Sequence, residues 1–108
     1  MAEPLTIYQI LATTGLPCAF SHFKGGSDEV PVAPPYIVYI GAGQDDMAAD
    51  NTYIWKSNRY QIEYYFTEKD EELEDQLENL LLENGYNYTK SEDVYIEGED
   101  VFVIYYNV

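Results

Sequence analysis

The sequence predicts an α+β fold in which an antiparallel or mixed sheet of four to five strands is covered on one face by two helices. Two segments carry apolar residues at helical spacing, and several others alternate apolar and polar residues or run β-branched and aromatic. Clusters of Gly, Pro, Asn and Asp separate these segments. The expected order is α-β-β-β-α-β-β. Since the chain has 108 residues, we predict a single domain over residues 1–108.

The first helix is predicted from Thr6 to Thr14. Its apolar residues fall at helical spacing, namely Ile7, Ile10 and Leu11. Thr6 and Gln9 have the spacing of a capping box, and Gly15 follows as a stop. A loop is predicted from Pro17 to Pro35, with its Pro- and Gly-rich part at residues 24–35.

Three strands are predicted next. Residues 36–40 form an apolar run bounded by Pro35 and Gly41, and residues 41–46 are turn material. Residues 52–56 form the second strand, and Ser57-Asn58 is the expected tight link to the third. The third strand, residues 59–67, alternates most clearly, which predicts one buried and one exposed face.

The second helix is predicted from Asp70 to Asn84, with Asp70 as N-cap and Gly85 as the stop. One face carries leucines and the opposite face carries carboxylates, some of which stabilise the first turns through the helix dipole. Residues 87–97 and 101–107 then predict a closing hairpin around residues 98–100.

The charge balance excludes several classes of partner. Five Lys and Arg against 20 Asp and Glu give a net charge of −15, which repels phosphate backbones and anionic lipid. No apolar run is long enough to span a bilayer, and no signal peptide is recognisable at the N-terminus. A single Cys18 fits a reducing compartment. We therefore expect a soluble, cytoplasmic protein without membrane or sequence-specific nucleic-acid binding.

No catalytic, cofactor or metal site is predicted. Cys18 and His22 lie four residues apart in one loop, but no third group is evident that would orient the base or complete a zinc site. The acidic residues 45, 46 and 50 lack the ligand pattern of a calcium loop, and Gly41-Ala42-Gly43 is only half of a dinucleotide fingerprint. These features predict a protein that is not an enzyme.

Two candidate interaction surfaces remain. Twelve tyrosines are many for one small core, so some are expected at an interface. The candidate interface residues are Tyr60, Tyr64, Tyr65, Tyr105, Tyr106 and Trp55. The candidate acidic face lies on the second helix and consists of Glu71, Glu74, Asp75 and Glu78.

Several short motifs resemble a known family. They are Thr6 to Leu11, Gly15-Leu16-Pro17, residues 19–23, the strand at 34–39, the turn at 49–51 and residues 60–65. Together they look like tail-completion, or tail-terminator, proteins of long-tailed phages and prophages of Gram-positive bacteria. The resemblance implies a non-enzymatic virion-assembly protein that forms a ring, binds neighbouring tail or neck proteins, and resides in the host cytoplasm before it enters the tail or neck.

A different function fits the same charge. Small acidic proteins can imitate DNA and occupy the basic groove of a DNA-binding protein. In that alternative the acidic face would contact a DNA-binding host or phage protein. The two hypotheses differ in the expected response to salt.

Overall fold

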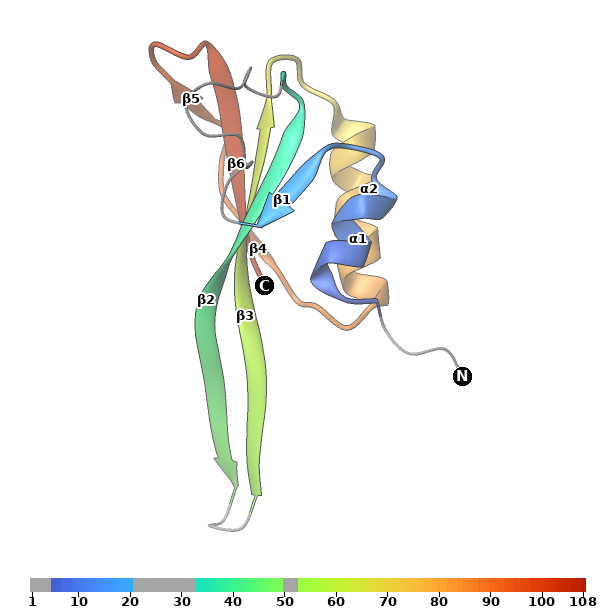
Figure 1. Cartoon of the computed structure of the whole chain (residues 1–108), viewed down its shortest axis with the longest axis vertical. Helices are drawn as coiled ribbons and strands as arrows, with labels where there is room; N and C mark the ends of the chain where they lie inside the picture. Colours follow the sequence, from blue (N-terminus) through green and yellow to red (C-terminus); the bar gives the residue numbers. More distant parts are fainter. Residues whose placement is uncertain (1–4, 21–32, 50–52) are drawn as a thin grey trace.

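The computed structural model describes the backbone of residues 5–20, 33–49 and 53–108, and the side chains of these residues outside 44–58. It shows an α+β fold of two helices and a mixed, open sheet of six strands. Both helices lie on the same side of the sheet (Figure 1). The predicted fold class is confirmed, with more strands than the four to five expected. The Pro- and Gly-rich loop predicted at 24–35 lies largely outside the described residues.

Helix α1 spans Ile7–Thr13 and begins with the predicted capping box. The Gln9 backbone N–H donates to the Thr6 hydroxyl at 3.3 Å, and the Thr6 N–H donates to the Gln9 side chain at 2.9 Å. Just before it, the Leu5 N–H donates to the Asn84 side chain at 2.8 Å. The start of α1 is thereby joined to the end of the second helix.

The sheet has the strand order β1-β2-β3-β6-β4, and β5 also pairs with β6. Strand β1 (Cys18–Phe20) runs parallel to β2 (Tyr36–Ala49), whereas every other pair is antiparallel. The predicted loop from Pro17 to Pro35 therefore contains a short strand. A run of three residues between turn residues carries no periodicity from which it could have been predicted.

Strands β2 and β3 (Tyr53–Phe66) form one long hairpin, which corrects three predicted features. The expected turn at 41–46 is part of β2, and the expected second and third strands are one strand running through Ser57-Asn58. A register shift between Gly41 and Gln44 bends the hairpin, and Gly43 has a φ of +96° there, which glycine adopts without strain. The outer part of this hairpin extends away from the rest of the sheet (Figure 1).

The predicted strand at 87–97 is interrupted. Strand β4 (Thr89–Lys90) and strand β5 (Val94–Ile96) pair with opposite ends of β6 (Val101–Asn107). Between them, Ser91 bonds to the backbone of Tyr105, which donates its N–H to the Ser91 hydroxyl at 2.9 Å. A serine side chain thus satisfies part of the β6 edge where no strand pairs with it.

Helix α2 spans Glu71–Glu83 and confirms the prediction closely. The Asp70 carboxylate accepts from the Leu73 N–H at 3.1 Å, as an N-cap does. Gly85 follows the C-cap with a φ of +87°. The end signals were local in sequence, which is why they could be identified without the fold.

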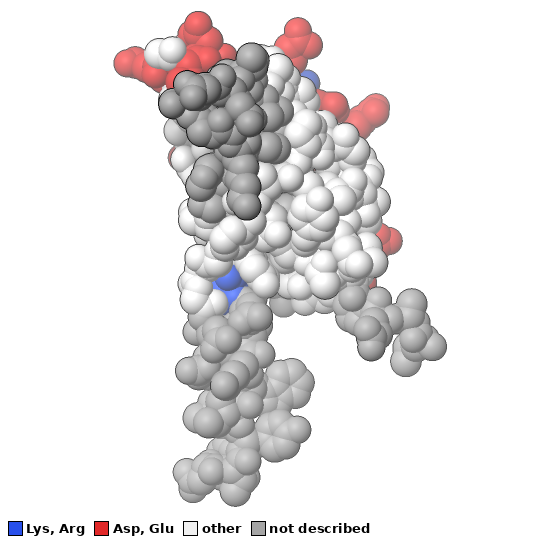
Figure 2. Space-filling view, viewed as in Figure 1, with Lys and Arg blue, Asp and Glu red and all other residues white. Residues whose placement is uncertain are grey.

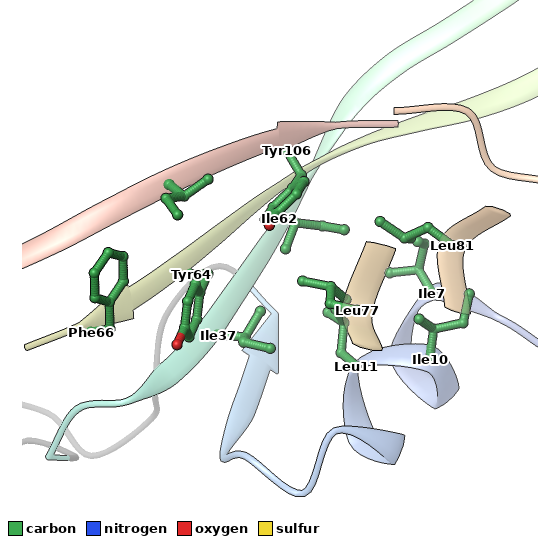
Figure 3. Packing of buried hydrophobic residues seen from close by; sticks show 11 residues of the cluster. Ile7, Ile10, Leu11, Ile37, Ile62, Tyr64, Phe66, Leu77, Leu81 and Tyr106 are labelled. Carbon is green, nitrogen blue, oxygen red and sulfur yellow. The ribbon is translucent and has the colours of Figure 1, made fainter. Parts of the chain in front are cut away.

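The hydrophobic core lies between the two helices and one face of the sheet (Figure 3). Its buried members are Ile7, Ile10, Leu11, Ile37, Ile62, Tyr64, Phe66, Leu77, Leu81, Ile104 and Tyr106. No described helix covers the opposite face of the sheet. The two faces of one sheet are therefore available for different roles.

Candidate interaction surfaces

The structure divides the predicted interface tyrosines between the two faces of the sheet. Tyr64 and Tyr106 are 1% and 0% exposed and belong to the core, so they offer nothing to a partner. Tyr60 is half-buried on the helix side. Tyr65 and Tyr105 are half-buried on the opposite face. The Trp55 side chain lies outside the described residues.

The buried tyrosines are core residues with a polar tip. The Tyr106 hydroxyl donates to Glu78 Oε2 at 2.8 Å, so the phenol is satisfied within the fold. Burial, followed by the charges of Asp70 and Glu74, raises the pKa of Tyr64 to about 12. Both phenols therefore stay neutral through the physiological range.

The face without helices carries a compact set of tyrosines, which we call the tyrosine face: Tyr36, Tyr65, Tyr105 and the adjacent Glu63. Tyr36 and Tyr65 stack with ring centroids 4.9 Å apart, and the Tyr65 hydroxyl donates to Glu63 at 2.6 Å. Burial and this hydrogen bond both raise the pKa of Tyr65. Tyr105 lies opposite Glu63 on the neighbouring strand. Rigid, half-exposed rings of this kind suit protein contacts.

A second aromatic surface lies on the helix side, where α1 meets β1. We call it the aromatic patch: Tyr8, Phe20, Tyr39 and Tyr60. The Tyr39 ring lies 5.3 Å from Phe20, 6.1 Å from Tyr60 and 6.5 Å from Tyr8, measured between centroids. Phe20 is 60% exposed and Tyr8 is 52% exposed. Of these four residues sequence reasoning named only Tyr60, because the position of Tyr8 depends on the packing of α1 and that of Phe20 on the unpredicted pairing of β1 with β2.

The predicted acidic face is divided in the structure. Glu71 and Asp75 are exposed, whereas Glu74 is 2% exposed and Glu78 is half-buried. The prediction that Glu74 and Glu78 point outward is therefore wrong. Both lie on the side of α2 that also buries Leu77 and Leu81, because residues three and four apart share one side of a helix.

Glu74 and Glu78 belong to a cluster of five charged residues, the ionic cluster: Lys69, Glu74, Glu78, Lys90 and Asp93. Lys90 Nζ lies 2.9 Å from Glu74 and 2.7 Å from Glu78, so one lysine on β4 bridges two carboxylates of α2. Lys69 Nζ lies 2.8 Å from Glu74 Oε2 and 3.1 Å from Asp93. The contact of Lys69 with Oε2 lacks hydrogen-bond geometry, so charge rather than a directed bond holds that oxygen.

The cluster shifts the pKa values of Glu78 and Lys90 in opposite directions. Burial alone would raise the pKa of Glu78, but hydrogen bonds from Lys90 and Tyr106 outweigh it and lower the pKa below its ordinary 4.5. Burial alone would lower the pKa of Lys90, but Glu74 and Glu78 outweigh it and raise the pKa above 10.5. Both shifts favour the charged forms of Glu78 and Lys90 in the folded protein, and this ion pair joins α2 to β4.

Glu78→Gln should weaken the acid dependence of stability. A carboxylate with a depressed pKa stabilises the fold above its unfolded pKa, and this contribution is lost as the pH falls through the folded value, here below pH 4.5. We expect the variant to lose about 1 kcal/mol at pH 7 and to lose less than the wild type between pH 7 and pH 3. Urea titrations at both pH values measure this, with the exposed Glu83→Gln as control. Equal pH slopes in the wild type and Glu78→Gln would contradict it.

Cys18 shows no sign of an activated thiol. The side chain is half-buried, and burial raises its pKa despite an opposing hydrogen bond with Tyr8. Reactive cysteines need the thiolate, which requires a lowered pKa. The predicted neighbour His22 lies outside the described residues.

Surface charge is unevenly distributed. Acidic side chains gather at the end of the molecule that carries the β5–β6 turn and along α2, while the face over α1 and β1 is largely uncharged (Figure 2). For a chain of net charge −15, an uncharged area that also exposes aromatic rings is unexpected on composition alone. Exposed apolar surface of this kind marks contact sites more often than inert surface.

Within the described parts of the chain, no three His, Cys, Asp or Glu side chains are grouped as metal ligands. No described helix has the length and apolar character needed to cross a membrane. Comparisons with protein-family models, with curated proteins and with solved structures find no match to this chain. The fold and its surfaces thus define a small α+β protein with two aromatic surfaces.

Proposed function

We propose that this chain is a structural assembly protein of a phage tail or head–tail neck, which binds copies of itself and neighbouring tail or neck proteins. The observation that carries the proposal is the aromatic patch. Tyr8 and Phe20 are more than half exposed on an uncharged face of a strongly acidic chain. An isolated protein gains nothing from such a surface, whereas an assembly buries it.

A component that joins two structures needs more than one contact surface. Copies within a ring contact each other laterally, and the ring contacts the proteins above and below it. The aromatic patch and the tyrosine face lie on opposite faces of the sheet, so one does not obstruct the other. The sequence motifs that resemble tail-completion proteins support the same assignment.

The acidity also fits this role. A ring whose lumen passes DNA benefits from walls that repel phosphates. Exposed acids such as Glu71 and Asp75 remain available for that purpose, since of the four acids of the candidate acidic face only Glu74 and Glu78 belong to the ionic cluster. The same exposed acids also support the alternative of an acidic DNA mimic, although two of its four candidate residues are paired inside the fold.

Mass in solution, measured by light scattering over a range of concentration and salt, separates these functions. For an assembly protein we expect a mass of several chains that rises with added salt, because salt screens the repulsion between copies of charge −15. For a DNA mimic we expect one chain, bound to a DNA-binding protein with an affinity that falls with salt. A single-chain mass under all conditions would contradict the proposal.

A further inference from the structure

We infer that the outer part of the β2–β3 hairpin is the arm by which one copy of this chain binds the aromatic patch of the next copy. The arm consists of the paired residues 44–49 and 53–58. This inference rests on the proposed function and adds the segment and the surface that make the contact between copies.

The arm has no partner in the described parts of its own chain. Strand β1 pairs with β2 only at residues 37–39, and β6 pairs with β3 only at residues 61–66. Beyond these positions the two arm strands pair only with each other, and the ribbon projects from the body (Figure 1). An isolated two-stranded hairpin is marginally stable in water, and open strand edges readily pair with another chain.

The composition of the arm suits burial. Half of its twelve paired positions are apolar or aromatic residues: Met47, Ala48, Ala49, Tyr53, Ile54 and Trp55. The register places Met47 opposite Trp55 and Ala48 opposite Ile54, so apolar residue types occur in cross-strand pairs. A two-stranded ribbon has no second layer of its own to cover such pairs, and a second copy supplies one.

Charge selects which surface the arm can approach. The arm contains Asp45, Asp46 and Lys56, so its formal charge is 1 − 2 = −1 in a chain of net charge −15. An arm with so little charge meets the least repulsion on an uncharged area of a second copy. The aromatic patch is such an area, because its exposed rings lie on the largely uncharged face over α1 and β1 (Figure 2).

The neighbouring edge strand offers backbone as well as side chains. Strand β1 ends the sheet in the described strand order, so its outer edge is open to another strand in that part of the chain. Phe20 on β1 is 60% exposed. Strand addition at this edge, with aromatic rings beside it, is an established way for one chain to bind another. Because arm and patch are different surfaces, the contact is head-to-tail and closes into a ring if the rotation permits.

Two variants test the contact from its two sides. Ile54→Ser/Trp55→Ser changes the arm, and Phe20→Ser changes the patch, both in the full chain. Each should raise the dissociation constant for self-association by about 30-fold, the loss of one central contact of about 2 kcal/mol. Leu82→Ser is the control. It removes an apolar side chain on α2 that is 52% exposed and lies in neither the arm nor the patch, so this variant should assemble as the wild type does. Circular dichroism checks that all variants fold.

Mixing the two variants gives the sharpest result. The arm variant keeps an intact patch and the patch variant keeps an intact arm, so the mixture should form pairs of two chains and nothing larger. Emission of Trp55, the single tryptophan, should shift to shorter wavelength as these pairs form. If the wild type assembles and both variants assemble equally well, the arm is not the contact and the proposed function stands. If the wild type stays a single chain, the arm contact and the proposed assembly function are both wrong.

Discussion

Replacing both lysines of the ionic cluster, in Lys69→Met/Lys90→Met, should lower the free energy of unfolding by about 3 kcal/mol at pH 7. The double change leaves Glu74, which is 2% exposed, without a cation. Removing the partner of a buried charge is strongly destabilising, and methionine preserves the packing of the lysine stems. The lysine side chains are 41% and 34% exposed, so solvent screening places the effect at the lower end of the usual range. Urea denaturation in moderate salt measures it.

The matched control is the triple variant that also carries Glu74→Met. With the fully buried carboxylate removed, the acid of α2 left without a cation is Glu78, which is partly exposed and keeps its hydrogen bonds from Tyr88 and Tyr106, so the stability should return to within about 1 kcal/mol of the wild type. If the double variant were as stable as the wild type, the cluster would contribute nothing to folding. If the triple variant were no more stable than the double, the loss would come from packing and not from charge.

The ionic cluster also shows why the acidic face was only half predictable. The helix itself was evident from Asp70, Gly85 and the leucine spacing, all of which are local signals. The partner of Glu74 and Glu78 is Lys90, which lies on a strand beyond the end of the helix. The spacing of residues within the helix does not indicate that this distant lysine will pair with Glu74 and Glu78. In a helix rich in acids, only the tertiary fold distinguishes the buried from the exposed ones.

The strands were predicted unevenly for a related reason. Alternation in β3 correctly separated Ile62, Tyr64 and Phe66 from Glu63 and Tyr65, because one face of that strand packs on the helices. The arm gave no such alternation, since no described element packs against it, and Asp45 and Asp46 together with the preceding Gly41 and Gly43 resembled a turn. Strand β1 was missed because its existence depends on pairing with β2. Local periodicity predicts elements that pack against the core of their own chain. It does not predict elements, such as the arm, against which no described element packs.

The division of the tyrosines follows the same logic. Alternation placed Tyr64 and Tyr65 on opposite faces, but it did not say which face the helices cover. The structure assigns Tyr64 to the core and Tyr65 to the open face. Of the predicted interface tyrosines, only the half-buried ones therefore remain candidates for contact with a partner. It also adds Tyr8 on α1 and Phe20 on β1, which join the predicted Tyr60 through their shared neighbour Tyr39. Contact surfaces made of several elements become visible only once the topology is known.

Leu77→Ala should also cost about 3 kcal/mol of unfolding free energy, whereas Leu82→Ala should change it by less than about 0.5 kcal/mol. The two leucines share helix α2, and the same change in helix propensity applies to both, so the difference isolates packing. Leu77 is 2% exposed and points from α2 into the core, while Leu82 is 52% exposed (Figure 3). Chemical denaturation of the two variants measures the difference, and equal losses would mean that α2 is not anchored through Leu77.

The same pair of variants connects the core to the proposed assembly. Tyr8 of the aromatic patch is carried by α1, whose buried Ile7, Ile10 and Leu11 pack in the cluster that contains Leu77. A cavity at Leu77 should loosen α1 against the sheet, because the residues around a cavity lose contacts that close packing provided. Light scattering of Leu77→Ala at low temperature, where it is still folded, should therefore show weaker self-association than Leu82→Ala. Equal association would mean that the patch tolerates movement of α1 and that Phe20 and Tyr39 on the sheet carry the contact.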